Sequence, residues 1–249
     1  MSEPQEMLAP PSFFELARQA FSDTRRGYDL LAPKFEETPY ATPIEWLRAS
    51  LVRTDERYPL SAEETRGLDL ACGTGRAVRM LRRSCEEVVG IDFSSGMLEQ
   101  AQRFSRGYDG VSYRLCDLQE LSIAPESFDR IVTFGAWGHI LPSFRERLLH
   151  QIVGALRPGG TFVTLTTDEP VFGEKRFWFY LLFDLAIRIR NLIWFGEFHM
   201  YYRLNSTARL MRELALVLKG RQDFQLSAEP LPGFEETPLA LVVVYRPSA

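Results

Sequence analysis

Short apolar runs and longer amphipathic stretches alternate through the middle of the chain. The runs are rich in Val, Ile and Leu, which is typical of parallel strands covered on both faces by crossover helices. The pattern predicts strands at 67–71, 87–91, 111–115, 128–134 and 161–166, with helices between them at 76–83, 95–104 and 143–156.

The alternation stops at Asp168, where an aromatic stretch begins. A regular helix pattern returns at 206–219, with Ser206 as its expected cap. Two further strands are expected near 224–228 and 239–245, and the Gly- and Pro-containing segment between them favours an antiparallel hairpin. The pattern therefore predicts an α/β fold whose mostly parallel sheet ends in a hairpin.

The N-terminal part of the chain has a helical but interrupted pattern. Residues 1–11 have the composition of a frayed tail. Three prolines divide the helical sequence pattern of residues 12–52 into short segments. Ser12 is the expected first cap, and Glu15 completes a capping box with it. We therefore expect several short helices before the first strand.

Length and charge narrow the class of protein. A chain of 249 residues suits one domain with an elaborated lid. The net charge of -4 and the pI of about 5.6 provide no overall positive field, so nucleic acid is not an expected partner. We expect one domain over 1–249, made of a helical cap (1–60), a cofactor-binding core (61–168), an aromatic helical insertion (169–205) and a C-terminal helix with its hairpin (206–249).

The cysteines and the N-terminal residues indicate in which cellular compartment the protein is expected. Cys72, Cys85 and Cys116 are odd in number and lack CxxC spacing, so neither a disulfide framework nor a zinc site is expected, and no other metal. The first residues lack the basic start and apolar stretch of a secretion signal, and no apolar stretch of about 20 residues could span a bilayer. The expected compartment is a reducing cytoplasm.

The stretch "GLDLACGTGRAV" joins the first expected strand to a helix through two glycines. Gly73 and Gly75 can adopt positive φ and allow a ligand to approach the backbone, while the helix after them offers free N–H groups. Asp92 ends the second strand, where an acid can accept both ribose hydroxyls of a nucleoside. Asp117 follows the third strand, where it could accept the amine of adenine beside Leu118.

Each of these features alone also fits an ordinary turn, because Gly and Asp are common turn residues. Together they lie at the ends of three successive strands, and this order indicates an adenosine-containing ligand. Val78 replaces the third glycine of a nicotinamide site, and Asp69 would repel a pyrophosphate but attract an ammonium group. An adenosine with an amine and no phosphate describes S-adenosylmethionine.

At this point the sequence resembles the class I S-adenosylmethionine-dependent methyltransferases, over about 66–167. "GLDLACGTGR" resembles the first motif of that family, "GIDFSSGML" its ribose segment, "CDLQEL" its adenine segment, "FDRIVTFGAWGHI" its fourth-strand motif and "LRPGGTFV" its turn into the fifth strand. "YDLLAPKFE" resembles the opening of the small-molecule branch. The resemblance implies a doubly wound, Rossmann-like sheet of seven strands with the last strand reversed.

Carried over by position, the resemblance implies roles for individual residues around the cofactor. Asp69, Gly73 and Gly75 would hold the methionine portion, Asp92 the ribose, Met97 the nucleoside, and Asp117 and Leu118 the adenine, while Phe134 would lie beneath the cofactor and Tyr28 would close over it.

The end of the fourth strand bears on the methyl acceptor. Amino-methyltransferases of DNA and RNA with this fold typically carry Asn/Asp-Pro-Pro-Tyr/Phe there, whereas this chain has "FGAWGH". Together with the acidic net charge, this argues against a base flipped out of nucleic acid. We expect a small, largely apolar or aromatic acceptor.

His139 lies where the methyl would be transferred and is the candidate base, since imidazole ordinarily titrates near neutrality. A packed or helix-capping histidine is the competing interpretation. The other residues expected to line the acceptor pocket are Trp137 from the same segment, and Phe177, Trp178 and His199 from the aromatic stretch.

The 170–204 segment has three interpretations. Asp184, Arg188 and Asn191 fall at i, i+4 and i+7, which indicates a helix with a polar stripe and an Asp–Arg pair in favourable order. The helix could pack on the sheet and complete the core, or form a lid whose aromatics line the acceptor pocket. The third interpretation is peripheral contact with a membrane, through its arginines and Trp178 and Trp194.

The sequence therefore predicts a methyltransferase for a small molecule. Two alternatives remain open at this stage: a catalytically silent S-adenosylmethionine-binding module that acts through a partner, and a nicotinamide-dependent oxidoreductase. The pattern indicates no oligomeric state.

Overall fold

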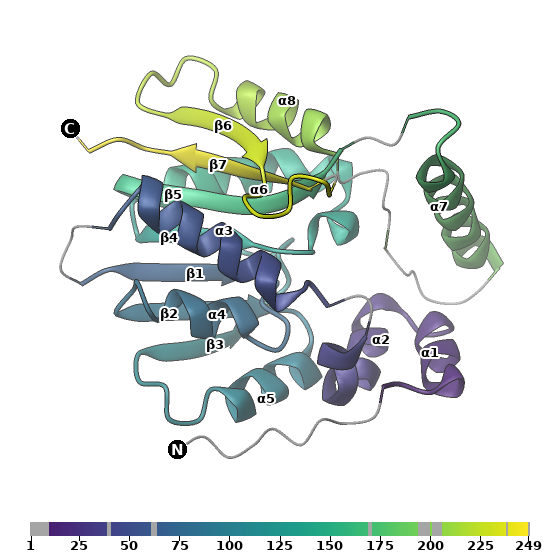
Figure 1. Cartoon of the computed structure of the whole chain (residues 1–249). Coiled ribbons are helices and arrows are strands. Elements are labelled where there is room, and N and C mark those ends of the chain that lie inside the picture. The colour runs from purple at the N-terminus through teal and green to yellow at the C-terminus, as the bar shows by residue number, and fades with distance from the viewer. Residues whose placement is uncertain are drawn as a thin grey trace.

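The computed structural model describes residues 10–38, 41–60, 64–168, 171–193, 200, 206–237 and 239–248. Its centre is a seven-stranded sheet with the order β3-β2-β1-β4-β5-β7-β6 (Figure 1). The strands are β1 (Arg66–Leu70), β2 (Glu87–Asp92), β3 (Val111–Leu115), β4 (Phe128–Thr133), β5 (Leu156–Thr167), β6 (Gln225–Pro230) and β7 (Leu239–Tyr245).

Strand directions confirm the predicted sheet. The first five strands pair in parallel, and β7 is antiparallel to both β5 and β6. The C-terminal hairpin inserts its second strand next to β5, so that Thr161 lies opposite Tyr245. The doubly wound sheet with a reversed last strand is therefore confirmed.

Helices cover both faces of the sheet (Figure 1). On one face lie α3 (Ile44–Arg57), α4 (Arg76–Leu81) and α5 (Ser95–Phe104), and on the other α6 (Pro142–Ala155) and α8 (Thr207–Val217). Successive strand residues point to opposite faces, so each face has its own core. Leu51, Val78, Leu98, Val132 and Val243 belong to the first core, and Leu148, Ile152, Leu214, Ile131 and Phe162 to the second.

The N-terminal pieces are α1 (Phe13–Ala20), α2 (Thr24–Leu31), the 3-10 helix η1 (Ala32–Glu37) and α3. The capping box of α1 is confirmed: the Ser12 N–H donates to Glu15 Oε2 at 2.7 Å, and the Glu15 N–H to Ser12 Oγ at 3.4 Å. The helical region extends beyond residue 52, because the last turns of α3 pack on the sheet. The division of the chain at residues 60, 168 and 205 stays a prediction.

The predicted helix in the aromatic stretch is present as α7 (Lys175–Ile193). It lies beside α1 and stands away from the sheet (Figure 1), so the interpretation that it completes the core over the sheet is wrong. Arg190 Nη2 donates to the carbonyl oxygen of Ser22 at 2.5 Å and connects α7 to the turn after α1. In the described part of the chain, no helix is long and apolar enough to cross a membrane.

Arg130 of β4 anchors α3 on the sheet. Its side chain is 1% exposed, its Nη1 contacts Asp55 Oδ1 at 2.5 Å, and its Nη2 donates to the carbonyl oxygen of Tyr58 at 2.8 Å. A buried guanidinium is tolerated only with such partners, because desolvation of a charge is costly. Both partners come from the end of α3.

We expect Asp55→Ala to lower the free energy of unfolding by about 2–3 kcal/mol, because it leaves the buried Arg130 charge without its counterion. Urea denaturation followed by circular dichroism measures the change. Glu56→Ala is the matched control, since Glu56 is exposed on the same helix, and it should change stability little. Equal effects of the two substitutions would contradict the anchoring role of Arg130.

Candidate active site

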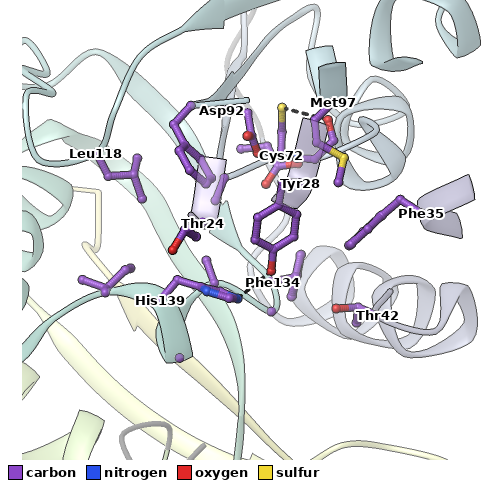
Figure 2. A pocket seen from close by; sticks show the side chains of 18 of the residues that line it. Thr24, Tyr28, Phe35, Thr42, Cys72, Asp92, Met97, Leu118, Phe134 and His139 are labelled. Carbon is purple, nitrogen blue, oxygen red and sulfur yellow. Dashed lines mark hydrogen bonds between the residues drawn. The ribbon is translucent and has the colours of Figure 1, made fainter. Parts of the chain in front are cut away.

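A cavity of about 500 Å³ lies beyond the carboxyl ends of the parallel strands. The strand order reverses between β1 and β4, and in open α/β sheets such a switch point forms the crevice where ligands bind. The volume is in the range of sites for small organic ligands. Figure 2 shows Leu118 toward one end of this cavity, and Thr42 and Phe35 toward the other.

The loop between β1 and α4 has three residues in the left-handed region. These are Ala71 (φ 56°), Gly73 (φ 51°) and Gly75 (φ 78°). Gly73 lines the cavity. Gly75 lies behind the loop, where a Cβ would collide with the hydroxyl of Tyr113, so it shapes the loop and does not line the cavity. The sequence predicted the two glycines but not the strained Ala71.

Asp92 connects this loop to the next one. The Gly73 N–H donates to Oδ2 at 2.8 Å, and the Ser94 N–H donates to Oδ1 at 2.9 Å. Burial raises the pKa of the Asp92 carboxyl to about 6, although these backbone hydrogen bonds oppose the rise. Each oxygen accepts one backbone hydrogen bond and can accept another from a ligand, so the carboxylate can bind two neighbouring hydroxyls.

Asp69 is the second buried acid of the cavity. Its side chain comes from β1, and burial, followed by the nearby charge of Asp92, raises the pKa of its carboxyl well above the ordinary value. No hydrogen bond to this carboxylate is found among the residues that the structure describes. Two acids in one buried site favour a ligand that brings positive charge.

Asp117 follows β3 and lies at the more exposed side of the cavity. Its Oδ1 accepts a hydrogen bond from the Gln119 N–H at 2.9 Å, and Arg25 Nη2 lies 3.9 Å from its Oδ2. The structure brings the following predicted residues together around the cavity: Tyr28, Asp69, Gly73, Asp92, Met97, Asp117, Leu118, Phe134 and His139.

Helix α2 covers the cavity and brings Tyr28 to His139 (Figure 2). Tyr28 Oη and His139 Nε2 lie 2.7 Å apart, and the ring centroids are 5.3 Å apart. Asp29 holds this helix in place, because its Oδ1 accepts hydrogen bonds from Ser94 Oγ at 2.6 Å and from the Gly96 N–H at 3.0 Å. The sequence pattern did not indicate a role for Asp29, although this residue lies next to Tyr28 in the "YDLLAPKFE" motif.

Glu36 makes a similar connection from η1 to α4. It accepts a hydrogen bond from Thr74 Oγ1 at 2.7 Å, and Arg76 Nη2 and Arg79 Nη2 lie 3.0 Å and 3.5 Å from its oxygens. Nothing in the local pattern distinguishes Glu36 from the acid next to it. The two acids Asp29 and Glu36 fix the N-terminal helices over the cavity.

Three expected pocket residues lie elsewhere, and one cannot be placed. Trp137 is fully buried in the core, where its Nε1 donates to Thr164 Oγ1 at 2.8 Å, because the short 3-10 helix η2 (Trp137–His139) turns it inward and His139 toward the cavity. Phe177 and Trp178 pack on each other on α7, with ring centroids 5.4 Å apart, and do not line the cavity. His199 lies outside the described residues, although Met200 lines the cavity.

The family model and the relatives that match this chain are all described as methyltransferases. A model of the methyltransferase domain matches residues 68–160. The demethylmenaquinone methyltransferase of Thermotoga maritima is 32% identical over 171 residues, which cover 66% of this chain and 72% of that protein. The ubiquinone/menaquinone biosynthesis C-methyltransferase of Desulfotalea psychrophila is 36% identical over 107 residues, 41% of this chain and 42% of its own length. This second match therefore spans less than half of the relative.

Solved structures support the fold. A complex of DhpI with SAH has a TM-score of 0.60 and 19% identity, and the superposition covers 96% of this chain and 100% of that chain. At this identity the likeness concerns the architecture.

We expect S-adenosylhomocysteine to bind more weakly as the pH falls through about 6, because Asp92 must be ionised to accept two hydroxyls and burial raises its pKa to about 6. Affinity at pH 5 should be roughly tenfold lower than at pH 8. Isothermal titration calorimetry across this range measures the effect.

Asp92→Asn is the matched variant for this prediction. It should weaken binding by about 1–3 kcal/mol at pH 8 and remove the change near pH 6. If Asp92→Asn kept the same pH dependence, the titrating group would be another one, and the assignment of Asp92 would be wrong.

Proposed function

Because this chain belongs to the class I S-adenosylmethionine-dependent methyltransferases, we propose that it methylates a small, largely apolar molecule. The observation that carries the proposal is the single cavity that combines buried acids, a glycine loop and an apolar wall. The acids suit the cofactor, and the apolar wall suits the acceptor.

The residues of the cavity fit the proposed cofactor, which supplies an activated methyl group on a positively charged sulfur. Asp92 would accept the ribose hydroxyls, and Asp117 would accept the adenine amine, with Leu118 against the ring. Asp69 would face the positive charge of the methionine portion, since its carboxylate is buried in the cavity and makes no hydrogen bond within the described part of the chain. The buried carboxylates of Asp69 and Asp92 would repel a pyrophosphate, which disfavours a nicotinamide cofactor.

The acceptor side of the cavity is apolar. Beyond His139, its lining continues through Ile140, Leu141, Phe144 and Met200. Such a wall binds an apolar body through burial of surface, and it offers few charged groups for a polar substrate. The relatives are named for demethylmenaquinone, and on this basis we propose an aromatic acceptor of the quinone class in a form that carries a hydroxyl.

The Tyr28–His139 pair can take the proton that such a hydroxyl must lose. We assign the donor role in the 2.7 Å hydrogen bond to the Tyr28 hydroxyl. The Tyr28 oxygen then accepts the proton of the acceptor hydroxyl as its own proton passes to His139 Nε2. Loss of this proton would make the acceptor electron-rich, so that it could bond to the methyl carbon as the carbon–sulfur bond breaks and S-adenosylhomocysteine leaves. The imidazolium would hold the proton until it is released to water, and where a ring carbon is the nucleophile its own hydrogen would leave as a second proton.

The direct test is a transfer assay with S-adenosylmethionine that carries a labelled methyl group. Reduced quinones and simple phenols are offered as acceptors, next to polar amines and acids, and extracted products are identified by mass spectrometry. Label in the aromatic products supports the proposal. Label only in polar acceptors, or binding of S-adenosylhomocysteine with no transfer to any acceptor, overturns it, and the second outcome favours a silent module.

We expect His139→Ala to lower kcat by about 100-fold or more, because the proton acceptor is removed, with little change in the affinity for S-adenosylhomocysteine. Tyr28→Phe should lower kcat and also shift the pH profile of kcat, since the relay then lacks its hydroxyl. Steady-state kinetics from pH 6 to 9 measures both. A His139→Ala enzyme of nearly full rate would reduce this residue to a wall of the pocket.

A further inference from the structure

The solvent-facing side of α7 is apolar along its whole length. The exposed large apolar side chains of the helix all lie within about 140° of its circumference when successive residues are placed 100° apart. Their exposed fractions range from 46% for Trp178 to 87% for Leu192. The full set is Trp178, Phe179, Leu182, Leu185, Ile189, Leu192 and Ile193, which we call the apolar stripe.

The opposite side of the same helix carries the polar groups. Asp184 is only 7% exposed. Arg190, at the edge of the exposed side, donates to Oδ1 of Asn191 on the opposite side at 2.7 Å and to the carbonyl oxygen of Ser22. A helix on the surface of a globular protein normally has the reverse arrangement, with its apolar face inward. The apolar stripe of α7 is therefore suited to an apolar surrounding outside the molecule.

Exposed apolar side chains continue around α7. Val171 and Phe172 precede it and are 64% and 75% exposed, and the Phe172 ring lies 5.6 Å from that of Trp178. Phe14 and Phe21 are exposed on and just after α1, the helix beside α7 (Figure 1). An exposed group of large apolar side chains of this kind marks a place of interaction.

Charge indicates the nature of the surface that α7 meets. The helix carries Lys175, Arg176, Arg188 and Arg190 and only one acid, Asp184, in a chain of net charge -4. Arg176 pairs with Glu174 at 3.1 Å, and Arg190 is turned toward Ser22, so the positive charge beside the apolar stripe comes from the exposed Lys175 at its start and Arg188 at its border. Anionic lipid headgroups attract such residues, while apolar and aromatic side chains enter the boundary between headgroups and acyl chains.

We propose that α7 docks on a lipid bilayer that contains anionic lipids, with the apolar stripe inserted at the interface. The contact between Arg190 and Ser22 places this helix next to the turn that continues into Asp23 and Thr24, and both of these residues line the cavity. Docking therefore brings the mouth of the cavity to the membrane surface. On the basis of the proposed function, the bilayer is then the source of the apolar acceptor, which enters the cavity without crossing water.

Flotation of the full chain with lipid vesicles tests the docking, without any acceptor. Vesicles of phosphatidylcholine with phosphatidylglycerol should bind the protein, and those of phosphatidylcholine alone should bind it several-fold less, as should the mixed vesicles at high salt. The double variant Leu182→Glu, Ile189→Glu should reduce the bound fraction at equal lipid by about tenfold or more, because it places two charges in the apolar stripe.

Leu216→Glu is the matched control, because Leu216 is 71% exposed on α8, a helix that covers the sheet and lies apart from α7 (Figure 1). It should leave vesicle binding unchanged, and calorimetry with S-adenosylhomocysteine should show an intact cofactor site in all variants. Equal binding of the double variant overturns the proposal. A second result would also overturn it: ultracentrifugation shows a dimer for the unchanged chain and monomers for the double variant, and vesicles bind neither protein. The apolar stripe would then be the interface with a second copy of the chain.

Flotation with vesicles and the methyl-transfer assay together distinguish a failure of the docking proposal from a failure of the proposed function. Vesicle binding without any methylation of aromatic acceptors supports the docking and removes the assigned substrate class. If the chain methylates dispersed acceptors but does not bind vesicles, the docking proposal is contradicted and the proposed substrate class is kept.

Discussion

The carboxylate of Asp92 is the interaction on which the site depends, because it holds two loops in one arrangement. One oxygen accepts the N–H of Gly73, from the loop after β1, and the other accepts the N–H of Ser94, from the loop after β2. In this arrangement Ala71, Gly73 and Gly75 of the first loop have φ in the left-handed region. The order of the strands, the residues with positive φ and the buried carboxylate of Asp92 therefore act together to fix the conformation of these two loops.

The N-terminal helices depend on the same two loops. Ser94, whose N–H binds Asp92, also donates through its hydroxyl to Asp29 of α2. Thr74, the neighbour of Gly73, donates to Glu36 of η1. The helices that cover the cavity are thus attached to the two loops that line it, so the position of Tyr28 depends on the same hydrogen bonds that fix these loops.

The buried acids also oppose folding in the absence of a ligand. The pKa of Asp92 in the folded protein, about 6, lies above its ordinary value of 3.8, so the stability associated with its proton is present at low pH and is lost as the pH rises through about 6. Asp69 has its pKa raised in the same direction. At neutral pH the site therefore costs stability, which a positively charged ligand can restore through its preferential binding to the folded state.

Local features of the chain explain what could be predicted. The strands, the loop glycines and the acids at strand ends each depend on a few neighbouring residues, so the fold and the cofactor side of the cavity followed from the pattern. Asp29 and Glu36 could not be found in this way, since their partners lie 65 and 38 positions away. Trp137 was misplaced because the three-residue helix η2 changes the direction of successive side chains within one turn.

Helix α7 shows a further limit of sequence patterns, since a periodic pattern defines two faces of a helix but not which of them points outward. The sequence predicted a polar stripe of Asp184, Arg188 and Asn191 but not its direction, and in the structure Asp184 is buried while Arg188 is exposed. Arg190 contacts the Ser22 carbonyl, which is far away in sequence. The contact holds α7 next to the turn that leads to Asp23 and Thr24 of the cavity lining, while the apolar stripe stays exposed on the helix. A contact between elements far apart in the sequence therefore supplies what a periodic pattern leaves open, namely where the helix is attached.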